Sequence, residues 1–320
     1  LNTRMHDKLV VADGNAAIVG GRNLGDHYFG LSSDYNFHDL DVLGFGRVAR
    51  LAVDMFDQFW NSEGVVSAGR LDTTIDPDEV ASAWAGLQER NRSAPELVAF
   101  GVGARDWTLT LRSLARDLRP GTSTLVWDET GGRQIDQKVI GKMFGFMDLA
   151  RKELLISNAY IIPGQPGIDF IRKLSERGVD VKILTNSLAS HDVPAVNSHY
   201  KKWRDDLIRA GAELHELRPD AAIKGPVVEV PPVTGAFVGL HTKAVVVDRK
   251  HVFIGSMNFD PRSANINTEA GAFINSPELA KDLAMVMLRD MRPENSWEVR
   301  LDENDRPYWV NSDETVHRQP

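Results

Sequence analysis

The sequence predicts an α/β protein that is built around a parallel or mixed sheet and contains an internal duplication. Predicted strands and helices alternate through residues 153–217, which is the pattern of βαβ units. Five residues near the start of the chain recur at identical spacing near residue 241. Hydrophobic residues make up 42% and charged residues 26% of the 320 residues, proportions that are typical of a globular protein with a sizeable core.

Composition also excludes some classes of function and of site. The formal net charge is -8, and because nucleic-acid binding relies on Lys and Arg to neutralise phosphates, nucleic acid is not expected as the main partner. The absence of cysteine excludes disulfides, Cys-ligated metal sites and Cys nucleophiles. No run approaches the roughly 18 apolar residues that span a bilayer, and residues 1–14 lack the apolar segment of a signal peptide.

The first part of the chain begins with a predicted hairpin. Residues 4–12 predict a strand, Asp13-Gly14-Asn15 supply turn chemistry, and residues 16–21 predict the return strand. Asp76 and Pro77 are typical of the residues that cap and begin a helix. The further expected elements are helices at 46–60, 78–90 and 107–118, a strand at 122–128 and a helix near 135–151.

The second part alternates clearly. The expected elements are a strand at 153–161, a helix at 167–177 that ends at Gly178, a strand at 180–186, a helix at 198–210, strands at 212–217, 240–248 and 251–256, and a helix near 276–292. The polar, turn-rich tail from residue 293 predicts no function.

The duplicated residues share one spacing from a leading histidine, with offsets of 2, 7, 14 and 17 positions. The two sets are His6, Lys8, Asp13, Gly20 and Asn23, and His241, Lys243, Asp248, Gly255 and Asn258. In a strand, side chains two apart share a face, so each His and Lys should point the same way. Gly20-Gly21 and Gly255-Ser256 would let backbone approach a ligand closely. Each copy therefore offers an imidazole, an ammonium and an amide, groups that suit phosphate oxygens.

These residues resemble the phospholipase D superfamily, whose mark is a duplicated HxKxxxxDxxxxxxG(G/S)xN motif. The stretches MHDKLVVADGNAAIVGGRNLGDHYFG, LLISNAYIIPG, LTNSLASHDVPAVNSHY, HELRP and HTKAVVVDRKHVFIGSMNFDPRSANINTEAG resemble bacterial cardiolipin synthases more closely. The resemblance covers most of residues 1–290. It implies two similar α/β/α sandwich halves, residues 1–120 and 121–320, that are related by a pseudo-twofold axis, with the active site at their interface.

The resemblance also implies roles for individual residues. His6 would be the nucleophile that forms a phosphohistidine, and His241 the general acid and base. Lys8, Lys243, Asn23 and Asn258 would neutralise the phosphoryl charge, so that neither a metal nor a cofactor is needed. A family histidine is oriented by a carboxylate, for which Glu269 and Asp39 are the candidates, Asp41 being a weaker choice. Asp13 and Asp248 would support the turns, and Gly21 and Ser256 the phosphate site.

The expected function is phosphatidyl transfer that makes cardiolipin from phosphatidylglycerol and a second phospholipid. Hydrolysis by the same enzyme type, a nucleic-acid phosphodiesterase and an inactive fragment are the alternatives. The expected partners are phospholipids at a membrane surface, the expected location is peripheral on a bacterial inner membrane, and a protein partner stays open. Because only five residues precede His6, we expect an N-terminal part of the first half to be missing.

Two further features have competing interpretations. Residues 199–207 combine basic and aromatic residues that suit an anionic membrane interface, but a solvated amphipathic helix is the favoured interpretation. Five other histidines lack the spacing of metal ligands, and most are expected on the surface. These are His38, His191, His199, His215 and His251.

Overall fold

A large mixed sheet forms the centre of the molecule. The computed structural model describes residues 4–70, 76–94, 107–131, 134–312, 315–316 and 319. The sheet has ten strands in the order β17-β16-β15-β10-β9-β8-β12-β13-β14-β5. In chain order they are β5 (Thr122–Trp127), β8 (Glu153–Asn158), β9 (Asp180–Asn186), β10 (Ala212–Leu217), β12 (Lys243–Val247), β13 (His251–Gly255), β14 (Ala270–Asn275), β15 (Ser296–Leu301), β16 (Pro307–Val310) and β17 (Thr315–Val316). Within this sheet β8, β9 and β10 pair in parallel and the other described pairs are antiparallel, so the sheet is mixed, one of the two predicted arrangements.

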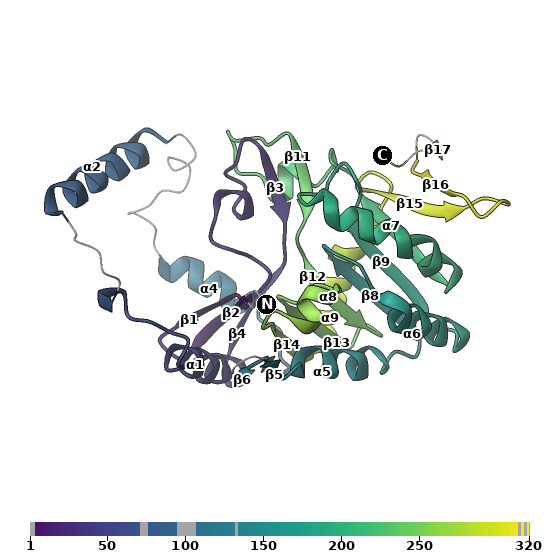
Figure 1. Cartoon of the computed structure of the whole chain (residues 1–320), viewed down its shortest axis with the longest axis horizontal. Helices are drawn as coiled ribbons and strands as arrows, with labels where there is room; N and C mark the ends of the chain where they lie inside the picture. Colours follow the sequence, from purple (N-terminus) through teal and green to yellow (C-terminus); the bar gives the residue numbers. More distant parts are fainter. Residues whose placement is uncertain are drawn as a thin grey trace.

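A second, three-stranded sheet carries the first copy of the motif. It consists of β1 (Leu9–Ala12), β2 (Ala16–Gly20) and β4 (Asp41–Phe45), in the order β1-β2-β4. The first described residues lie where the two sheets approach one another (Figure 1). A parallel pair of short strands, β3 (Tyr35–His38) and β11 (Phe237–Leu240), also joins the two parts of the chain. The strand predicted at residues 4–12 begins only at Leu9, because His6 and Lys8 belong to the segment that leads into it.

Helices cover the large sheet on both faces. α5 (Lys138–Met147), α6 (Gly164–Glu176) and α7 (Pro194–Arg209) share a hydrophobic core with one face. α9 (Pro277–Asp290), α1 (Arg47–Trp60) and the small sheet contribute to a second core on the other face. The short α8 (Pro261–Asn265) follows the second motif. The two halves are thus fixed together by shared apolar burial, the dominant favourable term in folding.

The remaining described elements lie away from this core. α2 (Pro77–Ser93) and α4 (Trp107–Asp117) contain no buried residue, and α2 stands apart from both sheets (Figure 1). Asp76 Oδ1 accepts the Asp78 N–H at 2.9 Å, which confirms the predicted helix cap. A small hairpin joins β6 (Thr130–Gly131) and β7 (Gln134–Ile135). Residues 95–106, where the sequence predicts no element, lie outside the described residues. None of the described helices has both the length and the apolar character needed to cross a membrane.

The two motif hairpins have matching surroundings. The His6 N–H donates to the Thr268 carbonyl at 3.1 Å, and the His241 N–H donates to the His38 carbonyl at 2.8 Å. Each acceptor comes just before the third strand of the other hairpin, β14 or β4. The chain belongs to a two-part α/β fold in which the two motif regions are related by pseudo-twofold symmetry. A boundary between halves at residue 120 stays a prediction, although β5 beyond it joins the large sheet.

Candidate active site

Each motif histidine is hydrogen-bonded to a buried carboxylate from the other half of the chain. His6 Nδ1 lies 2.9 Å from Glu269 Oε2, and His241 Nδ1 lies 2.7 Å from Asp39 Oδ2. Both carboxylate side chains are 0% exposed, whereas the histidine side chains are 25% and 7% exposed, respectively. Because Nδ1 of each ring is engaged, Nε2 is the ring nitrogen available for chemistry. The pairing is therefore crossed: each histidine is bonded to the carboxylate of the other half. The sequence left open which carboxylate serves which histidine.

The crossed pairing follows from the strand connections. Thr268 and His38 accept the backbone N–H groups of the two histidines, and the next residue along the chain is the carboxylate in both places. Each backbone hydrogen bond therefore positions the carboxylate that follows it, so that Glu269 lies beside His6 and Asp39 beside His241. Asp41, the weaker candidate, instead accepts Arg22 Nε at 2.6 Å.

The small motif residues make room for these carboxylates. A Cβ atom on Gly21 would lie only 2.8 and 2.9 Å from the two carboxylate oxygens of Asp39. At the equivalent place Ser256 Oγ donates to Glu269 Oε2 at 2.5 Å and accepts the Ala270 N–H at 3.0 Å. The second residue of each G(G/S) pair, Gly21 or Ser256, is thus explained by close approach of the orienting carboxylate.

The two lysines converge on the same region. Lys243 is 0% exposed, and its Nζ donates to the His241 carbonyl at 2.5 Å, as Lys8 Nζ does to the His6 carbonyl at 2.5 Å. Burial lowers the pKa of Lys243 to about 8, although Asp39 and Glu269 oppose the shift. Burial also lowers the pKa of Lys8, opposed first by Glu269. Charges from both halves therefore act on both lysines.

His241 lies in a more enclosed environment than His6. Its ring packs edge-on against Tyr28, with centroids 5.0 Å apart, and in a tilted arrangement against Phe37, also at 5.0 Å. Burial lowers its pKa to about 4, the neighbouring Lys243 lowers it further, and Asp39 opposes both effects. The His241 imidazole is therefore neutral near pH 7 before any substrate binds.

The asparagines differ in their contacts. Asn23 Nδ2 donates to Tyr28 Oη at 2.7 Å, which links the first motif to the ring that covers His241. Asn258 is buried, and its Oδ1 has no hydrogen-bond partner among the described residues. A buried polar atom without a partner is costly, so this position suits a residue whose partner is a bound ligand.

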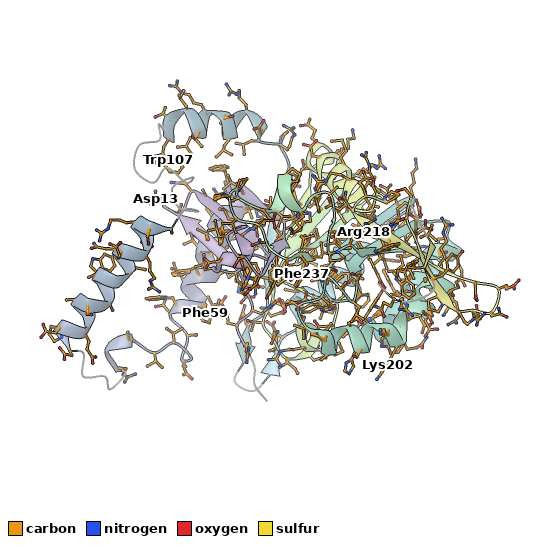
Figure 2. The ribbon with its side chains drawn as sticks, turned by 90° about the horizontal axis from the view of Figure 1, so that it is seen from above. Asp13, Phe59, Trp107, Lys202, Arg218 and Phe237 are labelled. Carbon is orange, nitrogen blue, oxygen red and sulfur yellow. The ribbon has the colours of Figure 1, made fainter. Side chains whose placement is uncertain are left out.

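The motif aspartates lie at the turns, away from the histidines. Asp248 has φ 50° and accepts the backbone N–H groups of Arg151, Lys152 and Glu153 at 2.8–3.2 Å. It thereby secures the entry into β8. Asp13 has φ 51° at the equivalent turn and lies on the outer side of the small sheet (Figure 2). Both residues thus lie at the predicted turns, and their role as support residues stays a prediction.

Several residues that support the site lie outside the two motifs and were not predicted from the sequence. Asp128 ends the predicted strand 122–128, and its carboxylate accepts the N–H groups of Glu269 at 3.2 Å and Val139 at 2.9 Å. Burial raises its pKa to about 6. Tyr160 Oη donates to Asp192, and its ring stacks on His191 with centroids 5.3 Å apart. Asp128 is a polar residue at the end of an apolar strand, and this was the sequence signal that could have identified it.

The expectation that most of the other histidines are surface residues was wrong. His38, His191 and His215 are buried. His38 Nε2 lies 2.8 Å from Asp290 Oδ2, and His215 Nε2 lies 2.9 Å from Glu213 Oε1. A carboxylate partner allows an imidazole to be buried. Asp290 lies far from His38 in the sequence, whereas Glu213 is only two positions from His215. Within the described ranges, no group of three or more His, Asp or Glu residues is arranged to hold a metal ion.

Asp7, between the first histidine and lysine, should make stability depend on pH. Burial and the neighbouring Glu269 raise its pKa to about 7, and one carboxylate oxygen is buried without a partner among the described residues. The folded state therefore favours the protonated acid, and its stabilisation is lost as the pH rises toward and through 7. We expect Asp7→Asn to raise the free energy of unfolding by about 1–2 kcal/mol more at pH 8 than at pH 5.

Thermal unfolding of Asp7→Asn and wild type at pH 5 and pH 8 measures this effect. Asp57→Asn, on the exposed side of α1, is the matched control and should show no pH-dependent gain. An equal change at both pH values would mean that the Asp7 carboxylate is not the titrating group.

Several known proteins are similar to this chain. A family model described as "Cardiolipin synthase, PLD-like domain" matches residues 143–291. Cardiolipin synthase C of Escherichia coli strain K12 is 31% identical over 329 residues, which cover 97% of this chain and 66% of that protein. An uncharacterized protein of Helicobacter pylori strain 26695 is 31% identical and matches 93% of this chain and 59% of its own length. The cardiolipin synthase of Staphylococcus aureus strain Mu50 is 25% identical, with 91% and 47% covered.

The solved structures extend the likeness to the fold. The phosphatidylserine synthase of Haemophilus influenzae Rd KW20 superimposes with a TM-score of 0.58 and 14% identity, over 90% of this chain and 62% of that one. The chain spans between about half and two thirds of the length of these relatives. Two motif copies, a matching family model and a shared fold lead to one assignment: the chain belongs to the phospholipase D superfamily, with cardiolipin synthases among its relatives.

Proposed function

We propose that this protein is a phosphatidyltransferase that makes cardiolipin from phosphatidylglycerol and a second phospholipid through a phosphohistidine. The supporting observation is the pair of imidazoles, each bonded through Nδ1 to a buried carboxylate of the other half. Two oriented rings with available Nε2 atoms provide one nucleophile and one proton carrier, which a double displacement requires.

In the first step, His6 Nε2 attacks the phosphorus of the donor phospholipid. The N–P bond forms as the bond from phosphorus to the head-group oxygen breaks, and His241 gives its proton to that oxygen, so that the head-group alcohol leaves. His241 is neutral before substrate binds. A phosphodiester bound beside it adds a negative charge, which raises its pKa and favours the protonated form that an acid needs.

In the second step, the acceptor is a hydroxyl of phosphatidylglycerol. His241, now neutral, takes the hydroxyl proton as the oxygen attacks phosphorus, and the N–P bond to His6 breaks. The product is cardiolipin, and both imidazoles return to their starting state. If water takes the place of the acceptor lipid, the same intermediate yields phosphatidic acid, so hydrolysis is the second candidate function.

The lysines and asparagines would stabilise the phosphoryl oxygens in both steps. Lys8 and Lys243 lie within electrostatic range of both carboxylates and of His241. Fixed cations in a water-poor site act strongly on developing charge and require little reorganisation. The side-chain N–H groups of Asn258 and Asn23 would donate to the same oxygens and complete this group. This arrangement needs no metal, and activity should therefore persist in EDTA.

The substrate class places the protein at a membrane surface, and we propose a peripheral location on a bacterial inner membrane. Relatives named as cardiolipin synthases support this choice of substrate. The formal net charge of -8 disfavours a nucleic-acid phosphodiester as the substrate.

Lipid analysis tests the proposal. The protein is incubated with labelled phosphatidylglycerol vesicles, with and without phosphatidylethanolamine, and the products are separated. Cardiolipin is the expected product. Phosphatidic acid alone would favour the hydrolase, and cleavage of a nucleic-acid diester without lipid turnover would exclude both.

A further inference from the structure

A large apolar cavity opens between the helices on the α5–α7 side of the large sheet. Its volume is about 510 Å³, within the roughly 300–1,000 Å³ of small-molecule sites. Its walls come from α5, α6, α7, α8 and the strands beneath them, and they include Phe144, Ile162, Phe170, Trp203 and Ala264. A lining of this kind selects for hydrocarbon and against phosphate or sugar.

The cavity is open to solvent at an apolar rim. Phe144 is 37% exposed, and its ring packs edge-on against Phe170 with centroids 5.4 Å apart. Trp203 is partly buried beside the same opening. Contiguous apolar surface left in water is unfavourable and marks a binding surface in soluble domains.

The cavity is continuous with the loop of the second motif. Met257, Phe259 and Asp260, which flank Asn258, form part of its wall. The Phe259 N–H donates to Asn158 Oδ1 at 3.2 Å, and the Phe259 carbonyl accepts the Ile162 N–H at 2.7 Å. This loop is held by both hydrogen bonds. It therefore has Asn258, which is proposed to bind the phosphate, on one side and the apolar cavity on the other.

Basic residues lie at the mouth of the cavity. His199 and Lys202 of α7 belong to the lining and are exposed, and Lys202 lies on the outer side of the molecule (Figure 2). A cation such as Lys202 beside an apolar opening suits the anionic surface of a phospholipid bilayer. Residues 199–207 therefore have two kinds of position. Tyr200 and Arg204 are buried in the fold, whereas Lys202 and Trp203 border the opening of the cavity.

We propose that this cavity holds one hydrocarbon chain of the phospholipid whose phosphate is bound between His6 and His241. The inference rests on the proposed function and adds a specificity element to it: the enzyme would select long-chain phospholipids by chain burial as well as by head-group chemistry. Each buried methylene contributes binding free energy, and binding by a remote part of the substrate can be used to position the reacting phosphate.

Chain-length preference in variants of the cavity tests this inference. Ala264→Trp would fill the cavity, and Phe144→Asp would put a charge at its rim, so that one of them remains informative if the other fails to fold. Met285→Trp is the matched control, because Met285 is 63% exposed on α9 at the opposite face of the sheet. Turnover of dioleoyl- and dihexanoyl-phosphatidylglycerol is compared in detergent micelles, after thermal unfolding confirms that each variant is folded.

We expect the two cavity variants to lose at least about tenfold in kcat/KM for the dioleoyl substrate, which corresponds to about two buried methylenes. Turnover of the dihexanoyl substrate should stay within about twofold of wild type, and the control should match wild type on both substrates. An unchanged chain-length preference in the variants would overturn the inference while the proposed function stands. A wild-type protein that turns over neither lipid would overturn the proposed function itself.

Direct labelling locates the chain without relying on turnover. Phosphatidylglycerol with a diazirine near the end of one chain is photolysed with the wild-type protein, and the labelled peptides are identified by mass spectrometry. Labels on residues 138–147, 164–176, 199–207 or 257–265 are expected and should disappear in Ala264→Trp. Labelling confined to other segments would place the chain elsewhere and refute the proposal.

Discussion

His6→Ala is expected to abolish phosphatidyl transfer and to prevent formation of any covalent phosphoenzyme. His241→Ala should lower transfer by at least about 10³-fold yet still accumulate a phosphoenzyme from a diester with a good leaving group. The difference arises because only His6 would form the N–P bond. An activated leaving group needs no proton, but the intermediate still needs His241 to activate the acceptor.

Rapid acid-free quenching followed by mass spectrometry measures the phosphohistidine in each variant. His251→Ala, which replaces a partly exposed histidine of β13 outside the pair, is the matched control and should behave as wild type. The reverse pattern, a phosphoenzyme in His6→Ala only, would exchange the two roles. Because burial keeps His241 neutral near pH 7, a state that a nucleophile also requires, the trapping result decides between them.

The crossed carboxylates extend this experiment. Glu269→Gln should weaken phosphoenzyme formation, as loss of its partner His6 does, although Glu269 belongs to the second half. Asp39→Asn should resemble the His241 variant. A defect that follows the half of origin instead would show that the contacts seen here are not those of the working enzyme.

Much of the fold was predictable wherever local patterns are strong. The hairpin that contains β12 and β13, the helices of the second part and the Asp76 cap all follow from apolar periodicity and capping chemistry. The strands β15 and β16 were not predicted, because the tail was interpreted from its polar, turn-rich composition. The alternation of Trp297 and Val299 with Glu298 and Arg300 is the pattern of an antiparallel strand with one exposed face, and it was the signal that could have found β15.

The candidate site was predictable in its members but not in its connections. Spacing alone groups His6 with Lys8 and His241 with Lys243. That Glu269 serves His6 depends on the Thr268 backbone contact, which joins residues more than 260 positions apart. Long-range contacts of this kind leave no local pattern. For the same reason Asp128, which follows β5 and accepts the Glu269 backbone N–H, was missed.

Lys243→Met is expected to make the protein more stable and much less active. Lys243 is 0% exposed, and burial lowers its pKa from 10.5 to about 8, so keeping its charge in the folded state is costly. The shift corresponds to about 3 kcal/mol, and loss of its hydrogen bond to the His241 carbonyl costs about 1 kcal/mol. The net gain expected at pH 7 is therefore about 2 kcal/mol in the free energy of unfolding.

The pH dependence identifies the charge as the cause. A lysine whose pKa is lowered in the folded state destabilises it fully below about pH 8, and the penalty disappears as the pH rises from about 8 to 10.5. The advantage of Lys243→Met over wild type should therefore shrink between pH 7 and pH 10 in thermal unfolding. Lys281→Met, at an exposed position of α9, should show no such trend.

Activity should move in the opposite direction. Removing a fixed cation that faces the developing phosphoryl charge costs about 10²–10³ in kcat, and phosphatidyl transfer by Lys243→Met at pH 7 measures this loss. A variant that loses stability and activity together would mean that Lys243 mainly supports the fold. A stable but inactive variant would show that the ammonium is maintained against its own cost of burial, which is expected of a group whose favourable partner, the phosphate, arrives only with the substrate.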